Sequence, residues 1–275
     1  MANQIQINPA LGIKHLFFFA LAALSFATAR GQMLFPESYA IILDTTRHFK
    51  GSVAPSVQLR RQKNNYTEIS NTADLVYRFK SHAITVANKF ELTKDGDDVV
   101  LSGGFIYARY KTFYDNPLIM EYYAQYHWAD VRGLQEKYAA GANVRYKFYK
   151  NVKGGLFAGA GPFLEREKWN FEGVRDDDLP PDTSPVKTDA LKFNLYISSI
   201  RCITEKIEIQ NAVYLQNKFT DAFNQPRLAA SLGVLLSITE YIGVGFQFQT
   251  IYDYRPIVPI DKFYYNTFTQ LEITF

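Results

Sequence analysis

The chain has 275 residues, of which 16% are aromatic, and it carries a formal net charge of +3 at pH 7. Its single cysteine, Cys202, excludes an internal disulfide, and the nearly balanced charge excludes the basic field with which proteins bind nucleic acid. The many aromatic residues and a mean hydropathy of −0.17 favour strands that show one face to lipid and the other to water.

Residues 1–31 have the pattern of a secretory signal peptide. Lys14 precedes an apolar run of roughly a dozen residues, and Ala27 and Ala29 follow in the A-x-A arrangement of a cleavage site. Cleavage is expected after Ala29 or after Gly31, and it lowers the net charge from +3 to +1 because Lys14 and Arg30 are lost. The run is shorter than the roughly 20 residues of a membrane-spanning helix, which favours a signal peptide over an anchor.

Residues 32–48 come before the repeating pattern, and two interpretations stay open: a periplasmic lead-in or a short plug. In residues 49–275 apolar and polar side chains alternate over segments of strand length, as on strands with two different faces. We predict twelve strands. The alternation is clearest at 73–79, 120–128, 135–148, 191–197, 207–216, 242–249 and 263–275, and weaker at 50–60, 82–93, 98–112, 154–168 and 227–237.

The last segment, 263–275, places Leu271, Ile273 and Phe275 on one face of a strand. This pattern, ending on an aromatic residue, resembles the C-terminal signal strand that the barrel assembly machinery of bacterial outer membranes reads. We expect this strand to pair with the first one and to close the barrel.

The connections between the strands give a second line of argument. Counting from the N-terminus, the odd-numbered ones include 94–98, 169–186, 217–226 and 253–261, whereas the even-numbered ones at 80–81, 149–152, 199–204 and 239–241 are mostly shorter. Outer-membrane barrels have short periplasmic turns and longer outside loops. The sequence therefore predicts an all-β fold, a transmembrane antiparallel barrel of about twelve strands, with its longest outside loop at 170–185.

Several short motifs have a familiar order. Residues 122–126 (YYAQY), 131–134 (VRGL), 140–146 (AGANVRY) and 158–161 (AGAG), with 71–74 and 254–256 near the ends, resemble the salt-stress-induced outer-membrane protein family, which is catalogued as a domain of unknown function. The resemblance covers roughly residues 49–275. It implies an outer-membrane β-barrel of Gram-negative bacteria and transfers no catalytic residue.

Catalytic and metal-binding patterns are weak. A barrel phospholipase would need His-x-Ser, and neither His48, His82 nor His127 has a serine two positions on. The acidic runs at 95–98 and 176–178 could attract Ca²⁺, but both are better explained as solvated loop charge. We therefore predict no enzyme, no cofactor and no metal site.

The remaining candidates are charged and polar side chains on predicted inward faces. The five that share two adjacent strands are Glu121, His127, Lys137, Arg145 and Lys147; the wider set adds Glu91, Lys192, Glu208, Gln247 and Glu272. Charges of both signs form either a salt-bridged filling or the lining of a narrow aqueous path, and twelve strands allow both.

The leading hypothesis is therefore a non-enzymatic barrel that mediates or gates passage of small solutes. A barrel that acts through its outside loops, or a lipid-modifying enzyme, are the alternatives. The expected partners are outer-membrane lipids and the assembly machinery; the oligomeric state stays open.

Overall fold

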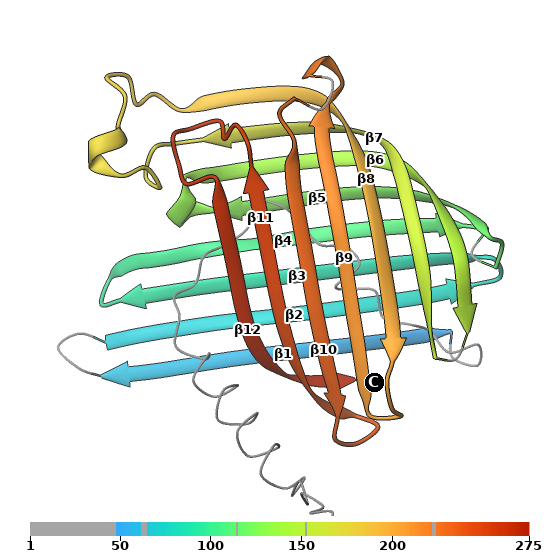
Figure 1. Ribbon diagram of the computed structural model, residues 1–275. Coiled ribbons are helices and arrows are strands. Elements are labelled where there is room, and N and C mark those ends of the chain that lie inside the picture. The colour runs from blue at the N-terminus through green and yellow to red at the C-terminus, as the bar shows by residue number, and fades with distance from the viewer. Residues whose placement is uncertain (1–47, 62–64, 114, 152, 222–223, 275) are drawn as a thin grey trace, which may run out of the picture.

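The computed structural model describes residues 48–61, 65–113, 115–151, 153–221 and 224–274. The predicted signal peptide, residues 32–47 and Phe275 lie outside these ranges. Within them the chain forms a closed antiparallel barrel in which each strand pairs with the next and β12 pairs with β1 (Figure 1). In chain order the elements are β1 (Phe49–Arg61), β2 (Asn65–Phe79), β3 (His82–Asp95), β4 (Asp98–Thr112), β5 (Leu118–Ala129), η3 (Asp130–Arg132), β6 (Leu134–Asn151), β7 (Gly154–Trp169), η4 (Asp176–Asp178), β8 (Val186–Cys202), β9 (Ile207–Lys218), η5 (Phe219–Asp221), β10 (Arg227–Ser237), β11 (Ile242–Asp253) and β12 (Phe263–Thr274).

The predicted fold class is confirmed: the described residues contain the twelve expected strands in the expected order. Most strands are longer than the alternation indicated, and the difference is largest for β2 and β8. β2 begins at Asn65, but its first half has polar side chains on both faces, so the sequence shows no alternation there. β8 begins at Val186, but the outward-facing Lys187 and Asp189 hide the alternation at its start. Period-2 hydropathy reports where a strand has an apolar face, which is shorter than the strand itself.

The strands bury polar side chains inside the barrel and expose apolar ones outside. On β8, Lys192, Asn194 and Ser198 are buried, whereas the alternating Leu191 and Ile197 are about half exposed at 52% and 49%. This arrangement is the reverse of a water-soluble core, and it is the alternation found in barrels whose outer surface meets lipid.

The two ends of the barrel differ in their connections. One end, here called the turn end, has short links such as Lys80–Ser81 between β2 and β3. The other, the loop end, has residues 170–185 between β7 and β8 and residues 254–262 between β11 and β12 (Figure 1). The connection at 94–98, whose Asp-Gly sequence is also typical of a tight hairpin, is a tight turn at Gly96 and Asp97, because β3 and β4 extend to Asp95 and Asp98.

β12 meets β1 over a short distance. Within the described residues their ladder consists of Ser52 with Thr274 and Val53 with Ile273. This pairing confirms the predicted seam between the last strand and the first. Beyond it the two strands run in different directions (Figure 1), while β1 stays paired with β2 along its whole length, from Phe49 to Arg61.

Candidate functional site

The lumen contains a buried cluster of ion pairs near the loop end, here called the loop-end cluster. Its members come from five strands and are Lys137, Glu165, Glu167, Lys192, Arg227 and Asp253. Their side chains are between 1% and 11% exposed. Three carboxylates therefore lie among three cations, which leaves the cluster electrically balanced.

Lys137 joins the two carboxylates of β7. Its Nζ atom lies 2.6 Å from Glu165 Oε2 and donates to Glu167 Oε1 at 2.9 Å. Lys192 also donates to Glu165, and the indole Nε1 of Trp169 donates to Glu167 Oε2 at 3.2 Å. Alternation along β7 puts Glu165, Glu167 and Trp169 on one face, so one strand supplies both acids and the aromatic beside them.

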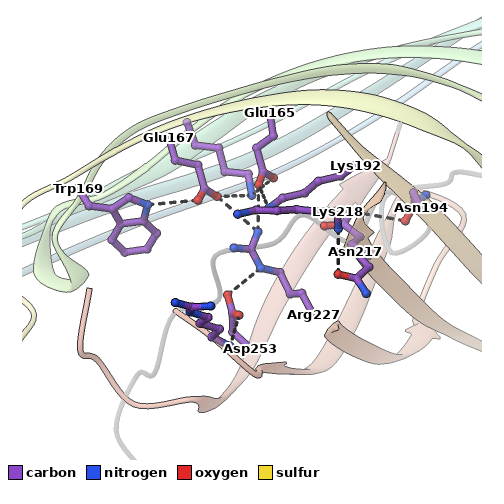
Figure 2. Close-up of polar contacts among 12 residues, drawn as sticks. Glu165, Glu167, Trp169, Lys192, Asn194, Asn217, Lys218, Arg227 and Asp253 are labelled. Carbon is purple, nitrogen blue, oxygen red and sulfur yellow. Dashed lines mark hydrogen bonds and ion pairs between the residues drawn. The ribbon is translucent and has the colours of Figure 1, made fainter. Parts of the chain in front are cut away.

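Arg227 on β10 connects the two glutamates of β7 to Asp253 on β11. Its Nη1 lies 3.5 Å from Glu165 and 3.4 Å from Glu167, while its Nε donates to Asp253 Oδ2 at 2.9 Å. Figure 2 shows the guanidinium between the two glutamates on one side and Asp253 on the other. Because β7 and β10 are not neighbours in the sheet, these contacts cross the lumen rather than following the wall.

An apolar lid covers the loop-end cluster. The lid consists of Ala129, Leu134, Trp169, Val174, Val258 and Ile260, with Phe171, Val186, Ile257 and Tyr264 packed against it. Val258 and Ile260 come from the β11–β12 connection, whereas Leu134 and Trp169 come from the opposite side of the ring. The connection therefore reaches across the mouth of the barrel, beside η3 in Figure 1.

Two contacts, one ion pair and one cation–π contact, join the segments that carry the lid. Arg175 in the β7–β8 connection donates to both carboxylate oxygens of Asp261, at 3.2 and 2.9 Å. Arg132 in η3 places its guanidinium carbon 3.2 Å from the ring centroid of Tyr264. Burial lowers the pKa of Arg132 to about 10, so it remains a cation at neutral pH and keeps its attraction to the ring.

A second group, the turn-end cluster, surrounds Glu121. Lys111, Arg145 and Arg109 place nitrogens 3.4, 3.5 and 3.8 Å from Glu121 Oε1. Tyr196 donates its hydroxyl to Glu121 Oε2 at 2.5 Å and accepts from Arg145 Nη1 at 3.2 Å. Because β5 and β8 are separated by two strands, this cluster also crosses the lumen.

The position of the Tyr196 ring requires a glycine at residue 159. Gly159 on β7 is paired with Tyr196 on β8, and a Cβ atom at Gly159 would run into the tyrosine ring. Gly159 belongs to the AGAG motif, and Arg145 to the AGANVRY motif, that carry the family resemblance. These motifs therefore meet at the turn-end cluster.

The structure divides the predicted lumen residues. Glu121, His127, Lys137 and Arg145 lie inside the barrel, with 1%, 7%, 1% and 3% exposure. Lys147 lies at the turn end, where its Nζ donates to the backbone oxygen of Asp115 at 3.3 Å. The sequence grouped all five, but the structure distributes Lys137 to the loop-end cluster and Glu121 with Arg145 to the turn-end cluster.

The structure also shows where the wider set of lumen candidates and the predicted assembly signal lie. Lys192 belongs to the loop-end cluster, Glu91 pairs with Lys89 at 3.4 Å, and Glu208 accepts from Gln210 at 2.7 Å. Leu271 and Ile273 are on the outward face, 57% and 40% exposed. Gln247 and Glu272 are partly buried on β11 and β12.

Sequence reasoning missed six of the ten charged residues in the two clusters. Glu165 and Glu167 lie in a stretch where Arg166 and Lys168 charge the other face too, which hides the alternation. Arg227 is the first residue of a weakly alternating strand, so its face was not assigned, and Asp253, the last residue of β11, was assigned to the following loop. Arg109 and Lys111 alternate with Ala108 and Tyr110, a signal that could have placed them on the inward face.

Among the residues the structure describes, His, Cys, Asp and Glu side chains form no group that could hold a metal ion. In the same ranges, no helix combines the length and apolar character of a membrane span.

A family model described as "Protein of unknown function, DUF481" matches residues 56–273. No curated protein matches the chain. Solved structures with a similar fold include the β domain of the Bordetella autotransporter BrkA, at 11% identity and a TM-score of 0.37, covering 82% of this chain and 96% of that one. A porin matches at 6% identity and a TM-score of 0.33, covering 82% and 99% of the two chains. The Pseudomonas putida toluene transporter TodX matches at 7% identity and a TM-score of 0.34, covering 82% of this chain and 87% of that one.

Proposed function

The chain belongs to the DUF481 family of proteins of unknown function, and we propose that it is a non-enzymatic outer-membrane barrel that gates passage of small solutes through a narrow lumen. Within the family we place it with the salt-stress-induced outer-membrane proteins that its motifs resemble. The single observation that carries the gating proposal is the balanced loop-end cluster, which crosses the lumen beneath an apolar lid.

The burial of the cluster supports a closed resting state. The side chains of Lys137 and Glu167 are each 1% exposed, so these charges have almost no contact with bulk solvent. A barrel of eight strands is filled by its own side chains, whereas one of 16–18 leaves an open channel. Twelve strands fall between these limits, and here side-chain ion pairs fill the part of the lumen that lies beneath the lid, between β6, β7, β8, β10 and β11.

The chemistry of the filling supports a gate over a permanent plug. Apolar residues of similar volume are often as stabilising as a buried ion pair, or more so, because ions are costly to remove from water. A lumen that needed only filling would have no use for six charges. When the lid and the Arg227 contacts separate, the same side chains line a hydrated path, and their balanced charge favours small solutes over ions of one sign.

The test is single-channel recording on the full-length mature protein, refolded and inserted in planar bilayers. The proposal predicts brief openings from a closed baseline. No conductance above that of a lipid-only membrane, from protein whose mobility on a denaturing gel changes on boiling, would overturn it. The boiling control ensures that a silent sample contains folded barrel.

A second candidate function rests on the β7–β8 connection. Asp176–Asp178 in η4 are exposed, and Leu179 beside them is 41% exposed, so the loop presents an acidic surface with one apolar residue at the loop end. On this hypothesis the barrel is a carrier for a surface contact. Replacing residues 176–184 by a short Gly-Ser linker should then abolish the cellular phenotype while leaving the heat-modifiable barrel intact.

A further inference from the structure

The short seam between β1 and β12 has a consequence for how molecules reach the lumen. Pairing at the β4–β5 junction runs without interruption from Gly103–Ala129 to Thr112–Met120, but the described ladder of the seam ends at Val53–Ile273. Backbone N–H and C=O groups of a strand edge cannot face acyl chains, because lipid offers them no hydrogen bonds. In a membrane the seam must therefore either zip further or admit another molecule.

The interior behind the seam is more accessible than the interior behind the clusters. Register with β2 puts Ser56 and Arg60 of β1 on the inward face, and both are exposed. By contrast, inward side chains such as Glu165 and Arg145 on β7 and β6 are almost fully buried. Inward side chains on the β1 side of the lumen therefore meet solvent, whereas those at the clusters do not.

The two faces of the seam have opposite character. Outside, Val57 and Leu59 on β1 are 67% and 72% exposed, which makes an apolar rim at the level of lipid. Inside, Lys89 of β3 places its Nζ 4.8 Å from the ring centroid of Phe268 on β12. This contact passes behind β1 and β2 and joins the two sides of the seam. Lys89 also pairs with Glu91 at 3.4 Å, so an anionic head group that binds Lys89 competes with that carboxylate as well as with the ring.

We propose that the β1–β12 seam is a lateral entrance through which an amphiphile with an acyl tail and an anionic head group moves from the outer leaflet into the lumen. The tail lies along Val57 and Leu59, and the head group meets Lys89, which leaves Phe268 as the seam opens. The lid and the loop-end cluster close the axial mouth, so the seam is the side from which such a molecule can enter. This inference rests on the insertion in the outer membrane that is part of the proposed function.

A disulfide across the seam tests the entrance. Continuing the register of Ser52–Thr274 and Val53–Ile273 brings Val57 opposite Thr269 when the seam zips. The test variant is Val57→Cys with Thr269→Cys, and a matched control is Leu232→Cys with Phe248→Cys at the fully paired β10–β11 junction. Both are made in a Cys202→Ser background, so that the free native thiol does not interfere.

The probe is dodecanoic acid carrying a photoreactive diazirine, added to the full-length mature protein in lipid vesicles. Adducts are mapped to single residues by mass spectrometry after illumination. We expect inward adducts on Ser56 and Phe268 in the Cys202→Ser protein, their loss when the seam pair is oxidised, and their return on reduction. The oxidised control pair should label like the Cys202→Ser protein, because the β10–β11 junction is already closed.

Two outcomes overturn the entrance. One is labelling confined to outward residues such as Val57 before oxidation. The other is inward labelling that persists when the seam is locked. Lys89→Gln probes the head-group contact: inward adducts of the acid should fall while those of its methyl ester stay, and an equal fall of both overturns the anionic preference.

Ion conductance of the same samples separates this inference from the proposed function. Conductance without inward adducts overturns the entrance alone. Inward adducts without conductance overturn the proposed solute passage and leave the entrance standing.

Discussion

Lys137 Nζ lies 2.6 Å from Glu165 Oε2 inside the barrel, and the two side chains are 1% and 2% exposed. The register places Lys137 opposite Glu167, so its contact with Glu165 is a diagonal one, and a single ammonium group holds both acids of β7. Arg227 approaches the same acids from across the lumen. The Lys137–Glu165 pair therefore belongs to one of the two places where side chains of separated strands meet across the lumen, here β6 and β7 with β10.

Replacing Lys137 should leave two buried carboxylates short of a cation. We expect Lys137→Met to lower the free energy of unfolding by about 3–5 kcal/mol, the usual cost of removing one partner from a buried pair. Urea unfolding in vesicles, followed by tryptophan fluorescence, measures it. The matched control is Lys168→Met, whose 32%-exposed lysine lies 4.0 Å from Glu136 and should contribute less than about 1 kcal/mol. Equal effects of the two substitutions would contradict the account of the cluster.

The approach of Tyr196 to Gly159 predicts a steric effect. Gly159→Val should displace the ring that donates to Glu121 and cost about 1–3 kcal/mol, the range for overpacking a well-filled interior. The neighbouring Ala160 faces outward and is exposed, so Ala160→Val is the control. Unfolding curves that coincide for the two variants would show that the glycine has no such role.

A charged side chain introduced into the apolar lid should separate its parts. Val258 is 1% exposed within the apolar lid, so Val258→Asp should separate the β11–β12 connection from Trp169 and raise the fraction of time the channel is open. The comparison is Leu179→Asp in the exposed part of the β7–β8 connection. If planar-bilayer recordings show the same low activity for both variants and the wild type, the lid does not limit passage.

The outward face predicts how the protein sits in lipid. Leu195 is exposed near the middle of β8, and Leu195→Arg should destabilise the barrel by about 2–4 kcal/mol, as arginine does at the bilayer midplane. Leu191 lies four residues nearer the loop end of the same strand and is 52% exposed, so the same change there should cost less, toward the about 0–1 kcal/mol found near an interface. Equal costs at the two depths, measured by unfolding from vesicles, would be inconsistent with a membrane belt.

The sequence predicted the strands well because each barrel strand has an apolar and a polar face. Residues 135–148 alternate so regularly that β6 and the inward positions of Lys137 and Arg145 followed directly. The family motifs also had a structural reason, since Gly159 and Arg145 both meet Tyr196. What alternation reports is the face of a residue, and four of the five predicted lumen residues lie inside for that reason.

The grouping of the charges could not be predicted in the same way. Which inward residues meet depends on how the barrel tilts and closes, which brings Arg227 of β10 to Glu165 of β7 across the lumen. The lid escaped prediction because Val258 and Ile260 lie in a segment that looked like ordinary loop. The two-pair seam, likewise, is a property of strand direction and not of the local sequence.

The most direct measurement of the central claim is the single-channel conductance of a barrel whose loop-end cluster has lost four of its six charges without a change in net charge, here called the emptied cluster. Lys137, Lys192, Glu165 and Glu167 are replaced together by serine, and the control is Arg166→Ser with Asp189→Ser, an exposed ion pair on the outward face of the same strands. Both proteins are first shown to be folded by their change in mobility on boiling. The account predicts a several-fold larger, longer-lived conductance for the emptied cluster and wild-type behaviour for the control. An emptied cluster that conducts no more than the wild type would contradict it.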